Sequence, residues 1–174
     1  CCSCGRICAT VLSIKALGGL GMGFTLKATL DLLPPDAVVT VAELVAAVVQ
    51  WNRGPLASLA DHPLSDRRVR IEVTDVGFTL RANPGQFDAI LLDVDNGPDG
   101  IVRDANFRIY SKTGLGKARD ALRPGGILAV WSAAPDHKFT MRLKESGFDV
   151  EVREVRARPN NKGPRHTIWF ARKR

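Results

Sequence analysis

Cysteine is missing from almost the whole chain: the 174 residues contain four, and all lie at the N-terminal end, as Cys1, Cys2, Cys4 and Cys8. No cysteine remains in the body of the chain to pair with them, which disfavours a disulfide framework. A metal or iron–sulfur site is also disfavoured, because the spacing does not give the paired C-x-x-C motifs of such sites. We therefore expect residues 1–10 to be a disordered or artefactual end. A body without cysteine is typical of the reducing cytoplasm.

The chain also lacks long apolar runs and several signature motifs. No stretch approaches the roughly 18 consecutive apolar residues of a membrane span, and the first residues do not form a signal peptide. We expect a cytoplasmic protein with no membrane partner. The sequence G-x-x-x-x-G-K-[ST] is absent, which argues against nucleoside triphosphate hydrolysis. G-x-S-x-G and H-E-x-x-H are absent too, which argues against the hydrolases that use them.

Acidic residues are scarce toward the C-terminus. Residues 151–174 contain eight Lys and Arg but only Glu151 and Glu154, so this segment carries +6 of the formal net charge of +7. Such a segment could face nucleic acid. The alternative is an exposed strand face whose alternating arginines are simply solvated. No RNA-binding signature and no interleaved aromatic residues accompany the charge, so we favour the solvated face and expect no nucleic-acid partner.

Along the rest of the chain, short apolar runs alternate with helix-like patterns. Such alternation predicts a parallel sheet with helices on both faces, a doubly wound α/β domain over residues 11–174. A hairpin around the sequence PNNKG adds an antiparallel strand at the end. Strands are expected at 10–19, 37–43, 68–75, 87–95, 127–133, 149–158 and 165–173, and helices at 24–33, 44–60 with a break near Gly54, 76–82, within 111–126 where Pro124 closes the helix, and 136–148.

Ligands of such sheets bind beyond the carboxyl ends of the strands. The first predicted strand ends in the glycine-rich sequence LGGLGMGFTL. A dinucleotide-binding turn needs G-x-G-x-x-G, whereas the glycines here follow the pattern Gly19-x-Gly21-x-Gly23. This spacing suits a nucleoside-and-amino-acid ligand lying across the turn better than a pyrophosphate at a helix N-terminus. The alternative is that the glycines only ease the packing of strand against helix.

Acidic or amide side chains follow the next strands. Glu43 lies 22 residues after Gly21, and an acid about 20 residues beyond such a turn is the usual acceptor for ribose hydroxyls. Asp75 could accept a hydrogen bond from an adenine amino group or, equally, cap the next helix. Three polar residues follow the strand at 87–95 and could hold an amine or accept its proton, or form an ordinary turn: Asp93, Asp95 and Asn96.

Together these motifs resemble the S-adenosylmethionine-dependent methyltransferase superfamily and, more narrowly, its spermidine synthase (aminopropyltransferase) branch. The resemblance implies a Rossmann-like seven-stranded sheet of the class I methyltransferase type, with S-adenosylmethionine or its decarboxylated form as cofactor. The implied cofactor-binding residues are Gly19, Gly21, Gly23, Glu43, Asp75 and Asp93. The resemblance rests on GGLGMGFTL, VTVAEL, RVRIEVTD, FDAILLDVDNGP, IYS and ALRPGGILAV.

The same resemblance implies the reaction and its catalytic residues. In spermidine synthases the aspartate at the position of Asp93 orients and deprotonates an attacking amine, and no metal is needed. Asn96 stands where these enzymes have the second acid of a D-x-x-D motif, with Asp95 as a shifted substitute. Met22 stands where they have an acid that binds the amino end of the ligand. A small-molecule amine is the implied substrate, and a homodimer is compatible with the family.

Two other functions remain open from the sequence. One is a methyltransferase that acts on a small molecule or on RNA. Amino-directed nucleic-acid methyltransferases carry [ND]-P-P-[FY] after the fourth strand, and the sequence DNGP does not match it. The other is a relative that binds a ligand without catalysing a reaction, which the residues at Met22 and Asn96 favour.

Overall fold

Seven strands form one sheet in the part of the chain that the computed structural model describes, residues 14–93, 108–156 and 163–174. Residues 1–10, with all four cysteines, lie outside these ranges. The strands are β1 (Ile14–Gly18), β2 (Val38–Glu43), β3 (Val69–Val73), β4 (Phe87–Leu92), β5 (Leu122–Ser132), β6 (Phe148–Arg156) and β7 (Arg165–Lys173). The helices are α1 (Phe24–Leu32), α2 (Ala46–Arg53), α3 (Val76–Ala82), α5 (Lys112–Ala121) and α6 (His137–Glu145), with two short 3-10 helices, η1 (Ala57–Ala60) and η2 (Pro63–Ser65).

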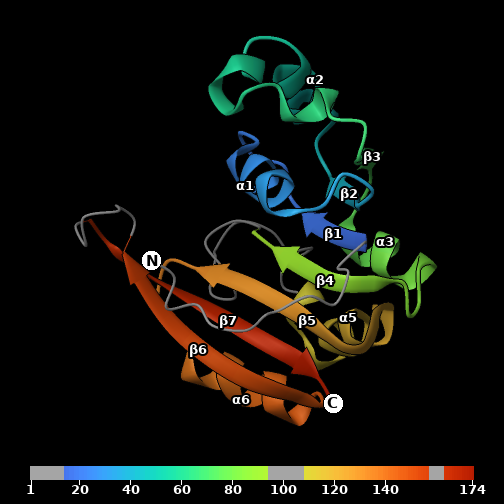
Figure 1. Cartoon of the computed structure of the whole chain (residues 1–174). Coiled ribbons are helices and arrows are strands. Elements are labelled where there is room, and N and C mark those ends of the chain that lie inside the picture. Colours follow the sequence, from blue (N-terminus) through green and yellow to red (C-terminus); the bar gives the residue numbers. More distant parts are fainter. Residues whose placement is uncertain (1–13, 94–107, 157–162) are drawn as a thin grey trace.

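The strand order is β3-β2-β1-β4-β5-β7-β6. Neighbouring strands from β3 to β5 run parallel, whereas β7 is antiparallel to both β5 and β6. The predicted fold is thereby confirmed, a doubly wound, mostly parallel sheet that ends in an antiparallel hairpin (Figure 1).

The helices cover the sheet with two separate apolar cores. Leu26 and Leu30 of α1 and Val49 of α2 pack with buried side chains of β1 and β2. On the opposite face, α3, α5 and α6 pack on the central strands in a second core that includes the fully buried Phe139 and Trp169. In Figure 1, α1 and α2 accordingly lie on one side of the sheet and α5 and α6 on the other. None of the described helices has the length and apolar character needed to cross a bilayer.

Most helix boundaries follow the predicted signals, with one correction. Asp136 caps α6 as predicted, since its carboxylate accepts a hydrogen bond from Phe139 N at 2.8 Å. The prediction that Pro124 closes the preceding helix is wrong. Helix α5 ends at Ala121, and β5 begins at Leu122, which pairs with Phe87 of β4. The β4–β5 register shifts just after this pair, and this irregularity lets Pro124, which has no backbone N–H to donate, sit inside the strand.

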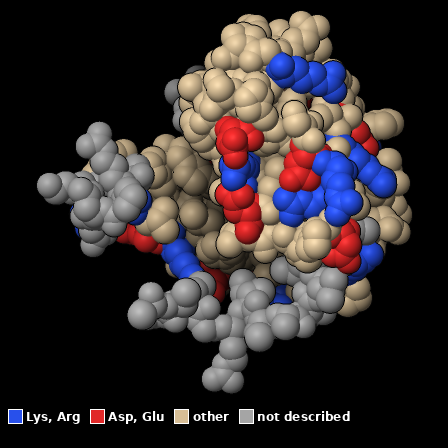
Figure 2. Space-filling view, turned by 45° about the horizontal axis from the view of Figure 1, so that its top comes forward, with Lys and Arg blue, Asp and Glu red and all other residues tan. Residues whose placement is uncertain are grey.

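In the C-terminal hairpin, β6 and β7, two arginines form ion pairs with acids. Arg153 contacts Glu151 at 2.6 Å, and Arg165 contacts Glu154 at 3.1 Å. Both pairs are exposed, and the solvated strand face stays a prediction. Figure 2, turned by 45° from Figure 1, shows Lys and Arg beside Asp and Glu, with wide uncharged areas between them.

The parallel register brings the predicted polar residues to one edge. Gly18 pairs with Ala42 of β2 and Leu92 of β4, and Glu43 pairs with Val73 of β3. The carboxyl ends of four neighbouring strands therefore meet beside the glycine-rich turn.

Candidate functional site

The glycine-rich turn between β1 and α1 has a backbone that other residues rarely adopt. Gly19, Gly21 and Gly23 have φ values of 86°, 52° and 84°, in the left-handed region that glycine enters without a Cβ clash. Gly23 also lacks room for a side chain, because a Cβ there would lie 3.0 Å from Asn52 Oδ1 and 3.0 Å from Pro63 Cγ. Backbone geometry thus requires glycine in this turn, as the sequence indicated.

Glu43 ties the turn to the loop after β2. Its side chain is buried, with 8% of the residue exposed. One carboxylate oxygen accepts a hydrogen bond from Leu20 N at 2.9 Å, and the other accepts one from Val45 N at 2.8 Å. A carboxylate oxygen has two lone pairs. Each oxygen of Glu43 can therefore still accept one hydroxyl, which suits the two vicinal hydroxyls of a ribose.

Asn52 of α2 is a site residue that the sequence analysis missed. Its amide nitrogen donates hydrogen bonds to Gly21 O at 2.8 Å and to Val48 O at 2.9 Å, and only 1% of the residue is exposed. The bond to Gly21 turns that carbonyl toward α2. No local pattern could have revealed this contact, since the partners lie 31 residues apart.

Asp93 follows β4 and reaches the other side of the turn. Its backbone N–H donates to Gly18 O at 3.2 Å, and its exposed carboxylate accepts a hydrogen bond from Thr25 Oγ1 at 2.7 Å. Thr25 belongs to the first turn of α1. An exposed carboxylate in this place can bind a cation beside the glycine-rich turn. The other two predicted catalytic residues, Asp95 and Asn96, lie outside the described residues.

Asp75 lies one strand further along the edge. Its carboxylate accepts a hydrogen bond from Gly77 N at 2.8 Å, so it caps α3. The preceding residue, Thr74, donates its N–H to Glu43 O at 3.1 Å. Of the two interpretations of Asp75, the helix cap is confirmed, whereas contact with adenine stays a prediction.

Exposed apolar side chains surround the turn. They come from the turn itself and from the loop that follows Glu43. Apolar side chains in such a place can cover the faces of a planar base or a thioether. The most exposed are Met22 at 54%, Phe24 at 53%, Leu44 at 48% and Val45 at 38%.

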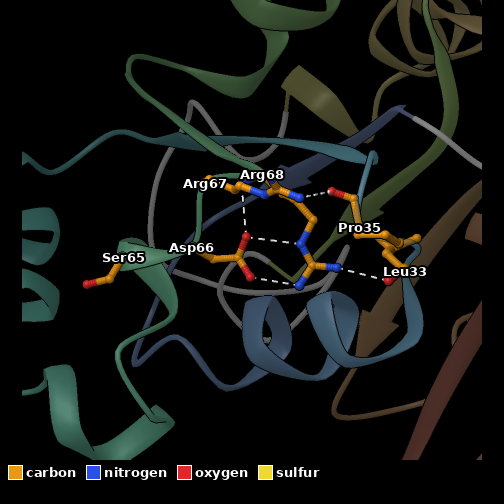
Figure 3. Close-up of a pocket in the computed structure, with 6 residues that line it drawn as sticks. All are labelled: Leu33, Pro35, Ser65, Asp66, Arg67 and Arg68. Carbon is orange, nitrogen blue, oxygen red and sulfur yellow. Dashed lines mark hydrogen bonds and ion pairs between the residues drawn. The ribbon is translucent and has the colours of Figure 1, made fainter.

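A cavity of about 570 Å³ at the amino ends of β2 and β3 has a different character (Figure 3). There Asp66 forms an ion pair with Arg68 at 2.7 Å, and Arg68 donates to Leu33 O at 2.9 Å. The hydrogen bonds from Arg68 lower the pKa of Asp66 from 3.8 to about 2. These contacts join the two loops that precede β2 and β3, and we assign them a structural role.

Comparison with known proteins agrees with the arrangement of the strands. No family model matches the chain. The polyamine aminopropyltransferase of Prochlorococcus marinus is 28% identical over 114 residues, which are 62% of this chain and 38% of that protein. Polyamine aminopropyltransferase 2 of Streptomyces coelicolor is 31% identical over 116 residues, 63% of this chain and 20% of that protein. The chain therefore spans well under half the length of these curated relatives.

Solved structures share the fold across nearly the whole chain. The spermidine synthase of Thermotoga maritima superposes with a TM-score of 0.75 and 18% identity, over 94% of this chain and 55% of that one. The chain is spermidine synthase-like and has the class I methyltransferase fold. The family resemblance predicted from the motifs is thus confirmed. The same fold occurs in the precorrin-6y C5,15-methyltransferase of Geobacter metallireducens, with a TM-score of 0.67 and 15% identity over 95% of this spermidine synthase-like chain and 82% of that one.

Proposed function

We propose that this chain binds an adenosyl ligand at the carboxyl edge of the sheet and transfers an aminopropyl group from it to an amine. The ligand would be decarboxylated S-adenosylmethionine, with S-adenosylmethionine and methylthioadenosine as related ligands. One observation carries the proposal. The buried carboxylate of Glu43 holds the glycine-rich turn, and the exposed carboxylate of Asp93 lies on the other side of that turn.

Each residue has a distinct part in this proposal. Glu43 accepts the ribose hydroxyls with its remaining lone pairs, and Asp75 accepts the adenine amino group. The turn of Gly19, Gly21 and Gly23 lets the ligand approach the backbone closely. The site geometry supports these roles because all these groups follow the carboxyl ends of neighbouring parallel strands.

The proposed chemistry needs positioning and proton acceptance. The lone pair of the amine nitrogen attacks the propyl carbon beside the sulfonium, and the carbon–sulfur bond breaks. The electron pair of that bond stays on sulfur, which leaves as a neutral thioether. Asp93 holds the incoming amine and accepts its proton. Asp95 and Asn96 are proposed to assist at the same strand end.

A second candidate is supported by Met22. This residue offers an exposed thioether at the turn, and no charge for the amino end of a ligand. Ligand binding without turnover would not require such a charge from the turn, and methyl transfer from S-adenosylmethionine to a small molecule or RNA is the other alternative. The methyltransferase fold is common to both candidates.

Calorimetric titration separates these functions. The protein is titrated with S-adenosylmethionine, decarboxylated S-adenosylmethionine and methylthioadenosine. We expect all adenosyl ligands to bind and the decarboxylated form to bind most tightly. Preference for S-adenosylmethionine would favour methyl transfer. No binding of any of the three would contradict both enzymatic candidates.

The variant Asp93→Asn tests the proposed catalytic residue. It should lower aminopropyl transfer to a diamine at least about 100-fold, because general base catalysis contributes at least this much. Methylthioadenosine affinity should change only a few-fold. The matched control is Asp36→Asn, which removes an exposed acid from the loop before β2, at the amino ends of the parallel strands. If the loss of affinity matched the loss of turnover, Asp93 would be a cofactor residue instead.

A further inference from the structure

A second cavity, of about 460 Å³, lies between α3 and α5, which pack against each other. We call it the α3–α5 groove. Three of its residues are basic and one is acidic. Its lining comprises Thr74, Asp75, Gly77, Phe78, Arg81, Arg108, Ile109, Gly114 and Lys117. Of the residues proposed to bind the adenosyl ligand, only Asp75 borders the groove.

The three cations of the groove have no acidic partner among the described residues. In the described ranges, neither Arg81, Arg108 nor Lys117 forms an ion pair. Other cations of α5 differ, since Lys112 pairs with Glu145 and Arg119 pairs with Asp120. Like charges that share a concavity repel one another, and a bound anion would relieve that repulsion.

Arg81 is folded into the groove. Its guanidinium carbon lies 5.8 Å from the centre of the Phe78 ring. Its Nη1 lies 4.0 Å from the point where a side chain at Gly77 would begin. The guanidinium therefore bends back toward the first turn of α3, where a Cβ at residue 77 would also lie 2.9 Å from Asp75 Oδ1 and 3.9 Å from Ile109 Cδ1.

Asp75 is the acid among the described residues that line the groove. The carboxylate of Asp75 accepts the N–H of Gly77 and forms no ion pair within the described ranges. Phe78, which is 57% exposed, adds a flat apolar surface beside Arg81. A planar ring can stack there while a phosphate meets the cations.

We propose that the α3–α5 groove binds a small phosphorylated molecule. Its oxygens would contact Arg81, Arg108 and Lys117, and guanidinium groups suit such oxygens because they donate two parallel hydrogen bonds. This ligand is anionic, whereas the proposed adenosyl ligands are neutral or cationic. The groove is therefore a second site with its own ligand chemistry.

Calorimetric titration with inorganic pyrophosphate and with adenosine diphosphate tests the proposal. Both probes should bind, and affinity should fall as NaCl rises from about 50 mM to about 200 mM. Tighter binding of adenosine diphosphate to protein saturated with methylthioadenosine would add a stacked ring to the anion contact, and equal affinities would assign the binding to the anion alone. The double variant Arg81→Gln/Lys117→Gln should weaken both probes at least about tenfold, because it removes two charge-assisted contacts.

The matched control is Arg53→Gln/Lys138→Gln, which removes the same charge from α2 and α6. Neither residue forms an ion pair in the described part of the chain. Equal weakening by both double variants, or no binding by the unaltered protein, would overturn the proposal. Methylthioadenosine is titrated into each variant as well. Its unchanged affinity in Arg81→Gln/Lys117→Gln would separate the groove from the proposed adenosyl site.

Discussion

The two ends of the parallel strands hold carboxylates in opposite ways. At the carboxyl end, Glu43 accepts hydrogen bonds from the uncharged backbone groups of Leu20 and Val45. At the amino end, Asp66 meets the guanidinium of Arg68 through two hydrogen bonds, at 2.7 Å and 3.0 Å. Both carboxylates join loops, but only one of them is neutralised by a cation.

This difference separates the proposed ligand site from the structural one. A buried charge without a counter-charge is costly unless hydrogen bonds compensate it. Further donors, such as ribose hydroxyls, would improve the surroundings of Glu43. The Asp66–Arg68 pair is already complete, since the guanidinium also donates to Leu33 O (Figure 3). It donates to Pro34 O as well. The carboxyl end is therefore where we propose that a ligand binds.

The largest expected effect is that of Glu43→Gln. The amide would place a donor against the N–H of Leu20 or Val45 and leave a buried donor unpaired. We expect methylthioadenosine to bind about 100-fold more weakly, a loss of about 2.7 kcal/mol. Calorimetry measures the affinity. Asp66→Asn is the control at the other end of the sheet and should leave binding unchanged. If both variants lost the same affinity for methylthioadenosine, the two ends of the parallel strands would not differ in ligand binding.

Two glycines of the turn separate the cost of backbone strain from the cost of close packing when each is replaced by alanine. Gly23→Ala should lower the free energy of unfolding by about 2 kcal/mol, since it adds close contacts to a strained backbone. Gly21→Ala adds only strain, because nothing lies within 4 Å of its new Cβ. It should cost about 1 kcal/mol. Urea unfolding measures both. A larger cost at Gly21 would contradict the packing of Gly23 against Asn52.

Asn52→Leu removes the hydrogen bond between α2 and the glycine-rich turn. It keeps a side chain of similar size but leaves Gly21 O without its side-chain donor. We expect about tenfold weaker methylthioadenosine binding, about 1.4 kcal/mol, because a buried acceptor loses its partner. Thr79→Val is the control, since it removes a buried hydroxyl from α3, away from the turn. Unchanged affinity in Asn52→Leu would mean that Asn52 does not position the turn for the ligand.

Asp66→Asn should have the smallest effect, and one that depends on pH. The pKa of Asp66 is lowered in the fold. The contact of its carboxylate with Arg68 therefore stabilises the fold above the ordinary pKa of an aspartate, and this stabilisation is lost as the pH falls toward about 2. At about pH 7 the variant should lose about 1 kcal/mol of unfolding free energy, as expected for a partly exposed pair. Urea unfolding at about pH 7 and about pH 3 should show the gap narrowing at the lower pH. A gap that widened on acidification would contradict the role of Arg68.

Sequence patterns predicted the features that are set by residues close together along the chain. Strand and helix alternation indicated the sheet and its closing hairpin, and the spacing from Gly21 to Glu43 indicated a shared edge. The pattern failed at Pro124, where pairing of Leu122 with Phe87 overrides the local preference. Asp95 and Asn96 stay predictions, because they lie outside the described residues.

The sequence by itself determined the order of strands and helices, the need for glycine in the first turn and the acid at the end of β2. These features follow from periodicity and backbone sterics, which act over a few residues. Only the tertiary structure decided that Asn52 holds Gly21 and that Thr25 meets Asp93, partners 31 and 68 residues apart. It also gathered Arg81 and Lys117 into one groove. Contacts between distant residues produce no periodic pattern in the sequence, because the packing of whole helices and strands brings these residues together.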